Sequence, residues 1–301
     1  MLKLIAGLSL ILISFVVFFR FLLFRGFKAP RVVERGTPAD SGISFTELSI
    51  ATRNSKFLHA WFLPKSPQAA CVVIMHGWGG NAEVMLPVCV PFLDAGLNVL
   101  VLDARGHGLS DEDRFSSLPK FAEDVEACID WLHEQHDLWD GHLVLLGHSV
   151  GAGAVLLTAS RDRRVDAVIS IAAFSHPRSM MQRYLYRFPS PVRRVIINQV
   201  QRIIGHTLDD IAPMYTIRNI DCPTLIVHGL DDVTVPVAEA RKIVDSAGKE
   251  SVKLVLIEGA SHDSVEKFLE SGGRLIVFLG QHGLIEAKVP TRSQPDRYGA
   301  G

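Results

Sequence analysis

A serine flanked by glycines is the first feature of the sequence that could do chemistry. Residues 147–151 read G-H-S-V-G, a G-x-S-x-G pattern, between an apolar run at residues 142–146 and small residues that begin at Ala152. A nucleophile on a sharp strand-to-helix turn needs glycine two positions away on either side, because larger side chains would collide with the turn. This layout favours Ser149 as a nucleophile. The alternative is a glycine-rich structural turn with an incidental serine.

The sequence resembles the α/β-hydrolase superfamily, and within it the serine aminopeptidase and monoglyceride-lipase-like branch. In this family an acid and then a histidine follow the serine along the chain. Residues 228–236, H-G-L-D-D-V-T-V-P, are similar to the family's acid loop, whose aspartate precedes x-x-V-P and so corresponds to Asp232. Asp231 is the alternative, with a loop-capping role for whichever aspartate is not the acid. Residues 258–263, E-G-A-S-H-D, resemble the turn that presents the catalytic histidine, which identifies His262 as the expected base.

Two further loops resemble parts of the same family. Residues 76–80, H-G-W-G-G, follow an apolar run and are similar to the HGxGG-type oxyanion loop. The resemblance implies that the backbone amides of Trp78 and Val150 form the oxyanion hole, and the alternative is an ordinary glycine-rich turn. Residues 103–110, D-A-R-G-H-G-L-S, resemble a loop whose usual part is structural, so His107 is expected to pack rather than to act as a second base.

These roles together imply a serine hydrolase. We expect it to cleave an ester or thioester of an apolar acyl substrate through a Ser-His-Asp triad and an acyl-enzyme. The substrate would be a small molecule, and a lipid-derived one is an option. The expected mechanism requires no metal and no organic cofactor. A peptidase or amidase of the same fold is the first alternative, because the family's aminopeptidases share these motifs. A non-catalytic binding module is the second, although such modules usually lose a triad member.

The apolar pattern indicates the elements that must position these residues. Residues 43–50 and 56–63 alternate in polarity and suggest an antiparallel hairpin. Most of the later apolar runs are separated by amphipathic stretches such as residues 121–136 and 238–247, which predicts a doubly wound, mostly parallel sheet. Ligands of such sheets bind beyond the carboxyl ends of the strands, where the four loops lie. The later apolar runs are residues 71–75, 98–102, 142–146, 165–171, 224–228 and 252–257.

A long connection interrupts this alternation. We expect a hydrolase domain over residues 43–285 with a helical cap insertion at about residues 174–221, because the latter stretch is longer than a simple connection. Its aromatic and apolar side chains would favour an acyl chain. Its basic side chains could face lipid headgroups or an acidic part of the substrate, or form a solvated helix face. The basic residues are Arg178, Arg183, Arg187, Arg193, Arg194 and Arg202.

The first 27 residues suggest a membrane anchor, followed by a linker at residues 28–42. Residues 4–24 would make a helix of about 31 Å, enough to cross a hydrocarbon core of about 30 Å. No small-x-small cleavage site follows, so we expect a retained single transmembrane helix rather than a signal peptide. Basic residues follow the apolar run, which predicts a cytoplasmic hydrolase domain. Residues 286–301 are expected to form a disordered polar tail.

The charge and cysteine content exclude other classes. The net charge of the chain is −1, but residues 1–35 hold six basic side chains and one acidic one, so the remainder is mildly acidic. An acidic domain argues against a nucleic-acid-binding surface. The four cysteines form no C-x-x-C pair and show no metal-ligand spacing, so they are expected to be buried core residues.

Overall fold

Eight strands form one sheet in the described part of the chain. The computed structural model describes residues 2–135, 139–264, 267 and 272–285. The strand order is β1-β2-β4-β3-β5-β6-β7-β8, in which β2 pairs antiparallel with β1 and β4 and the other neighbours pair in parallel. This confirms the predicted mostly parallel sheet and its hairpin. The strands are β1 (Thr46–Thr52), β2 (Lys56–Leu63), β3 (Cys71–Met75), β4 (Asn98–Leu102), β5 (Leu143–His148), β6 (Ala167–Ile171), β7 (Thr224–Gly229) and β8 (Val252–Ile257).

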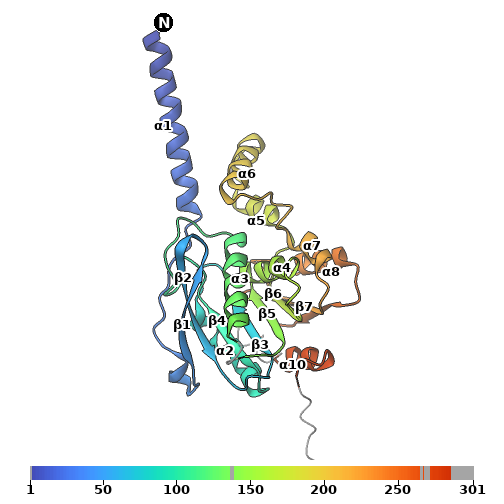
Figure 1. The fold of residues 1–301 in the computed structure, drawn as a ribbon. Coiled ribbons are helices and arrows are strands. Elements are labelled where there is room, and N and C mark those ends of the chain that lie inside the picture. Colours follow the sequence, from blue (N-terminus) through green and yellow to red (C-terminus); the bar gives the residue numbers. More distant parts are fainter. Residues whose placement is uncertain (1, 136–138, 265–266, 268–271, 286–301) are drawn as a thin grey trace, which may run out of the picture.

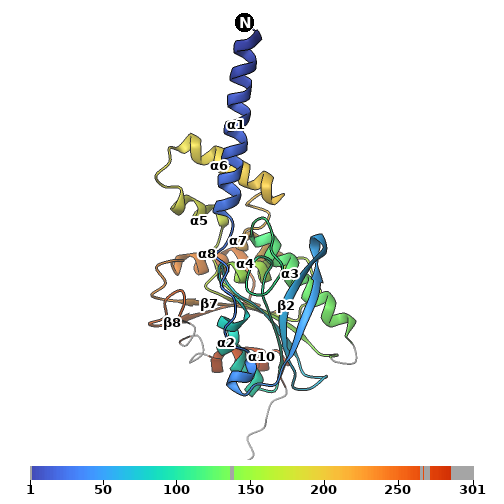
Figure 2. The same cartoon turned by 90° about the vertical axis from the view of Figure 1, so that its left-hand side faces the viewer.

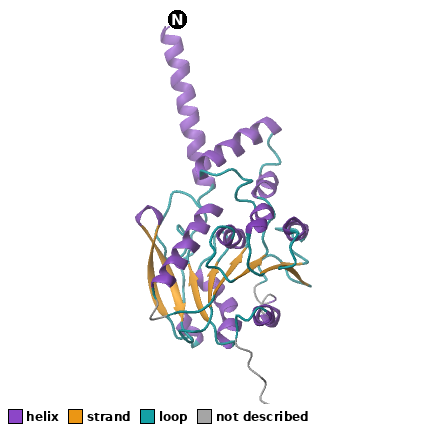
Figure 3. Ribbon diagram, turned by 45° about the vertical axis from the view of Figure 1, so that its right-hand side comes forward, coloured by secondary structure: helices purple, strands orange, loops and turns teal. Residues whose placement is uncertain are grey.

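Helices cover both faces of the sheet, which explains why its central strands are apolar throughout. Helices α3 (Leu118–Glu134), α4 (Val150–Ala159) and α8 (Ala238–Ala247) pack on one face, and α2 (Ala82–Asp94) and α10 (Gly272–Gln281) pack on the other (Figures 1 and 3). Successive side chains of a strand point to opposite faces. Within β3, Val73 therefore joins the core under α3 and α4, and Val72 joins the core under α2.

The predicted transmembrane anchor is not supported. Residues 2–26 do form a helix, α1 (Leu2–Gly26), which projects away from the sheet (Figures 1 and 2). Among the helices of the described residues, however, none has the length and hydropathy needed to span a membrane.

The expected linker after α1 lies along the domain. The Arg31 side chain donates to the carbonyl oxygens of Gly108 and Ser110, each at 2.8 Å. Further along, the Asn81 amide at the start of α2 donates to the carbonyl oxygen of Val32 at 3.1 Å. This segment therefore braces the loop at residues 103–110 and the loop that precedes α2. The expected polar tail at residues 286–301 lies outside the described residues.

The expected cap insertion at residues 174–221 holds three helices: α5 (Pro177–Tyr184), α6 (Ser190–Ile204) and α7 (Pro213–Thr216). Helices α5 and α6 stand apart from the sheet, at the end of the molecule from which α1 projects (Figures 1 and 2). Helix α6 is amphipathic, with Ile196, Ile197 and Val200 buried and charged residues outward. Below, residues 174–221 are called the cap segment.

Candidate active site

Ser149 lies on a strained turn between β5 and α4. Its backbone has φ 55° and ψ −114°, a region that non-glycine residues rarely adopt. Such strain persists only where the surrounding structure holds the residue in place. Here the Ser149 amide donates to the Ile171 carbonyl of the neighbouring strand β6 at 2.9 Å. The serine is thus presented at the carboxyl end of the central strand.

The two glycines of the G-x-S-x-G pattern are required by close backbone contacts. A Cβ atom on Gly147 would collide with the carbonyl group of Gly151, on the far side of the turn. A Cβ atom on Gly151 would collide with the His76 carbonyl oxygen and lie 2.6 Å from that of Met75. Both contacts are to backbone, which cannot move aside as a side chain could. The spacing noted in the sequence therefore has a steric origin.

The structure brings Ser149, His262 and Asp232 into one hydrogen-bonded chain. His262 Nε2 lies 3.0 Å from Ser149 Oγ, and His262 Nδ1 lies 2.7 Å from Asp232 Oδ2. These distances are within the range in which a histidine can take a proton from a serine hydroxyl. The three residues come from the loops after β5, β7 and β8, so the sheet places them together although they are far apart in sequence.

The loop after β7 separates the two candidate aspartates. Asp232 is buried, and its Oδ1 atom accepts a hydrogen bond from the Val235 amide at 2.7 Å. Asp231 is exposed, and its backbone amide donates to the Ala260 carbonyl at 3.0 Å. The carboxylate that faces His262 is therefore that of Asp232, while Asp231 fastens its loop to the loop that carries the histidine.

Two buried histidines brace this arrangement, and the sequence motifs did not single out either. His148, the residue before the serine, lies with its Nε2 atom 2.9 Å from the carbonyl oxygen of His262. Burial lowers the pKa of His148 to about 4, so it is neutral at pH 7 and donates that hydrogen bond. His228 Nε2 lies 2.7 Å from the Val235 carbonyl, and burial lowers its pKa too. Both lie inside the quoted motif segments, but at positions to which the sequence analysis assigned no role.

The glycine-rich loop after β3 lies against the serine. A Cβ atom on Gly77 would lie 3.2 Å from the Cβ atom of Ser149, so only glycine allows this approach without displacement. The amide of Trp78 makes no hydrogen bond within the described part of the chain. Val150 is the first residue of α4, where helix amides lack an intrahelical acceptor. Val150 thus follows the serine directly in the chain, and Gly77, the residue before Trp78, lies against the serine in space.

His76 fixes the shape of that loop. Its Nε2 atom accepts a hydrogen bond from the Ala104 amide at 3.0 Å, so its proton must be on Nδ1. Nδ1 then donates to the Gly77 carbonyl at 2.6 Å. Burial lowers the pKa of His76, which keeps the ring in this neutral form. The ring therefore orients the peptide bond whose amide belongs to Trp78.

A family comparison supports this reading of the fold. A family model described as serine aminopeptidase, S33, matches residues 66–216, half of the chain. The chain belongs to this family of α/β-hydrolases. The resemblance stated from the sequence motifs is thereby confirmed at the level of the superfamily.

Several proteins are similar to this α/β-hydrolase. An uncharacterised 31.7 kDa protein of Escherichia coli is 33% identical over 106 residues, covering 35% of this chain and only 37% of that protein. A monoacylglycerol lipase of Mycolicibacterium smegmatis is 25% identical over 245 residues, covering 66% of this chain and 83% of the lipase. The solved structure of a Pyrococcus furiosus esterase shares the fold, with a TM-score of 0.70, 22% identity and coverage of 84% of this chain and 98% of that one.

The D-A-R-G-H-G-L-S loop of this hydrolase holds a buried ionic network. Arg105 Nε lies 2.6 Å from Asp124 Oδ1, and its Nη2 lies 2.5 Å from Glu123 Oε2. His107 packs its ring against those of His76 and Phe121, and burial lowers its pKa to about 4. These contacts match the structural part expected of the loop.

Among the described residues there are two groups of three side chains whose potential metal-ligand atoms all lie within 4.8 Å of one another. In the group of His148, His262 and Asp263, both ring nitrogens of His262 already face Ser149 and Asp232. The second group is Glu34, His59 and Asp103. There, His59 Nδ1 lies 2.9 Å from Asp103, and its Nε2 lies 3.0 Å from Glu47. In both groups, the ring nitrogens of His262 and His59 therefore already have partners.

Proposed function

We propose that this α/β-hydrolase is a serine hydrolase that cleaves an ester or thioester of an apolar acyl substrate. The observation that carries the proposal is the chain of hydrogen bonds from Asp232 through His262 to Ser149. A serine hydroxyl is a weak nucleophile, and an adjacent base oriented by a third group is the arrangement that activates it.

The proposed reaction has two steps. In the first, Ser149 Oγ attacks the substrate carbonyl while His262 Nε2 takes its proton, and the same proton then goes to the departing alcohol or thiol. In the second, His262 takes a proton from the water that attacks the acyl-enzyme, and it returns this proton to Ser149 Oγ as the ester bond breaks and the acid leaves. Asp232 holds the proton of His262 on Nδ1 and stabilises the imidazolium in both steps.

The amides of Trp78 and Val150 are the proposed oxyanion donors. The negative charge that develops on the carbonyl oxygen would lie between them, at the N-terminus of α4, where the helix dipole favours an anion. Loss of one such donor typically costs about 100- to 1,000-fold in rate. His76 and Gly77 act on this step only indirectly, by positioning the loop.

The apolar acyl group is supported by the cap segment and by relatives. The cap segment exposes three aromatic side chains that an apolar acyl chain could contact: Tyr184, Tyr186 and Phe188. Of the similar proteins reported above, one is named a monoacylglycerol lipase and another an esterase. An amide substrate is the second candidate, because the family description is that of a serine aminopeptidase.

A matched set of substrates tests the proposal. Butyrate would be offered as its p-nitrophenyl ester, as a thioester and as its p-nitroanilide, together with aminoacyl p-nitroanilides, to the full chain and to Ser149→Ala. We expect turnover of the ester and thioester, and its loss in the variant. Turnover restricted to the anilides would select the peptidase. Folded protein that turns over none of these substrates would contradict the hydrolase and favour a binding module.

A further inference from the structure

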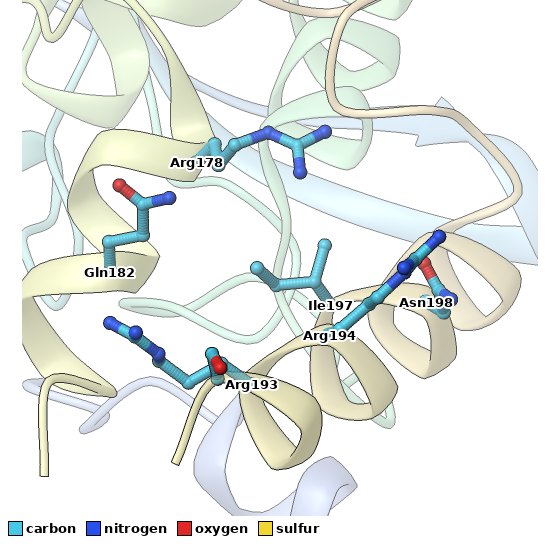
Figure 4. A pocket seen from close by; sticks show the side chains of 7 residues that line it. Arg178, Gln182, Arg193, Arg194, Ile197 and Asn198 are labelled. Atoms are coloured by element: carbon cyan, nitrogen blue, oxygen red, sulfur yellow. The ribbon is translucent and has the colours of Figure 1, made fainter. Parts of the chain in front are cut away.

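The cap segment encloses a cavity of about 390 Å³ between α5 and α6 (Figure 4). Arg178 and Gln182 reach it from α5, and Arg193, Arg194 and Asn198 reach it from α6. Residues four positions apart lie on one face of a helix, which is why each helix contributes such a pair. None of Ser149, Asp232 and His262 lines this cavity, so it is distinct from the site of the proposed chemistry.

The cavity carries an excess of positive charge. Of its three guanidinium groups, that of Arg178 lies 3.5 Å from Asp209, which is the only carboxylate paired with any of them among the described residues. The side chains of Arg193 and Arg194 form no hydrogen bond or ion pair within the same part of the chain. Neighbouring arginines repel one another, so this arrangement is one that an anionic ligand would stabilise.

The donor geometry indicates the class of anion. Arginine presents a planar fork of N–H groups that matches the oxygens of phosphate or carboxylate in pairs. A carboxylate carries one charge and two oxygens, which a single arginine satisfies. A phosphate monoester carries a charge of about −1.5 to −2 at neutral pH and three free oxygens. The side chains of Arg193 and Arg194 point in different directions from α6 (Figure 4), so a bound phosphate would draw these two long side chains together. With the amide groups of Gln182 and Asn198 they would then supply the donors that a phosphate monoester takes.

Helix α5 connects this cavity to the loop of the catalytic acid. Arg183, next to the cavity residue Gln182, donates to the carbonyl oxygens of Thr234 at 2.6 Å and Val233 at 3.2 Å. These two residues directly follow Asp232. The same short helix thus carries cavity residues on one side and contacts the acid loop on another. A substrate that spans both places would have its acyl carbonyl at Ser149 and its polar end in the cap segment.

We propose that the cavity is a phosphate subsite, and hence that the substrates of this hydrolase are acyl esters that bear a phosphate monoester. This inference rests on the proposed function for its second part, whereas phosphate binding itself does not depend on catalysis. The phosphate could belong to a soluble phosphoester or to a lipid headgroup in a bilayer, and the chemistry at the arginines is the same.

Kinetics with a matched pair of substrates test the subsite. The pair is 1-butyrylglycerol and 1-butyrylglycerol 3-phosphate, which differ only in the phosphate. In Arg193→Gln/Arg194→Gln we expect KM for the phosphorylated ester to rise about tenfold or more, with the neutral ester changed less than about twofold. Arg202→Gln is the control, since it removes an exposed charge from α6 outside the cavity. Equal effects of the double variant on both substrates would overturn the proposal.

Direct binding separates failure of the subsite from failure of the proposed function. Glycerol 3-phosphate would be titrated calorimetrically into the full chain, the double variant and Arg202→Gln, with circular dichroism as a check on folding. If the full chain and the control bind but the double variant does not, the subsite stands even if no ester is hydrolysed. If the full chain fails to bind, the proposal falls even if neutral esters are hydrolysed.

A vesicle-binding experiment distinguishes a soluble phosphoester from a lipid headgroup as the source of the phosphate. Flotation with phosphatidylcholine vesicles, with and without phosphatidic acid, would be compared with the titration. Binding of glycerol 3-phosphate in solution supports the subsite, whether or not vesicles also bind. Binding to phosphatidic acid vesicles without binding of glycerol 3-phosphate would show that the arginines contact a charged surface, and would overturn the subsite. Each arginine changed singly, as Arg193→Gln and as Arg194→Gln, provides a milder variant should the double one misfold.

Discussion

Replacement of Asp232 by asparagine tests how the histidine is held. Asp232 accepts from the Val235 amide with Oδ1 and faces His262 Nδ1 with Oδ2, each at 2.7 Å. An asparagine that keeps its oxygen on Val235 must turn its NH2 group toward Nδ1. Because an NH2 group only donates, the ring proton would move to Nε2, and the nitrogen that faces Ser149 could no longer accept the serine proton.

We expect Asp232→Asn to lose most of its catalytic rate. In serine proteases the corresponding change lowers kcat by about 10⁴-fold, because the histidine adopts the wrong tautomer. At 1.36 kcal/mol for each factor of ten, this is a loss of about 5 kcal/mol of transition-state stabilisation. We expect a loss of about 10³- to 10⁴-fold for Asp232→Asn, with little change in the free energy of unfolding because asparagine has the same shape and retains the Val235 hydrogen bond.

The assay is hydrolysis of p-nitrophenyl butyrate, with Asp231→Asn as the matched control. Asp231 is exposed and contributes only its backbone amide to the neighbouring loop, so its variant should retain activity within about threefold. Comparable losses in the two variants, or an Asp232→Asn enzyme within tenfold of the wild type, would refute the reasoning about the tautomer.

Three further changes probe the frame around the site. Gly151→Ala should abolish hydrolysis and lower the melting temperature, because its Cβ would meet the backbone of Met75 and His76; an active, stable variant would argue against the steric account. Arg105→Met should lower the free energy of unfolding, measured by urea denaturation, by about 3–5 kcal/mol, because it leaves the Asp124 carboxylate buried without its cation. A decrease of less than about 1 kcal/mol would contradict this. Burial, with the Asp103 carboxylate beside it, raises the pKa of Glu34 from 4.5 to about 7. The folded protein then binds more protons than the unfolded chain between these values, so stability should fall as pH rises from about 4.5 to 7, and Glu34→Gln should flatten that fall in thermal melts.

Local patterns in the sequence predicted much of the sheet. The bounds of β3, β4 and β8 agree with the apolar runs. For β3 and β4, which are buried along their whole length, the reason is that strands covered on both faces read as nearly continuous apolar runs. The turn that holds Ser149 was found from the spacing of its glycines, and the loops that hold Asp232 and His262 were found from their resemblance to the family. The structure places these three side chains together, and their catalytic roles stay predictions until activity is measured.

Contacts between distant segments could not be read from the sequence in the same way. The hydrogen bond of His148 to the His262 carbonyl joins residues 114 positions apart, and that of the Ala104 amide to His76 joins residues 28 apart. The sequence identified residues 28–42 only as a linker, and it gave no sign that Arg31 binds the loop at residues 103–110. Residues 2–26 form a helix as predicted, but no helix among the described residues is long and apolar enough to support the expected membrane span.

Labelling by a fluorophosphonate probe is the most direct test of an activated Ser149. The probe phosphonylates serines whose hydroxyl has a competent base, so the full chain and Ser149→Ala would be treated in parallel and the modified peptide located by mass spectrometry. The account predicts rapid labelling of the full chain on Ser149 and none on the variant. Folded full chain that stays unlabelled, or equal labelling of the variant, would contradict it.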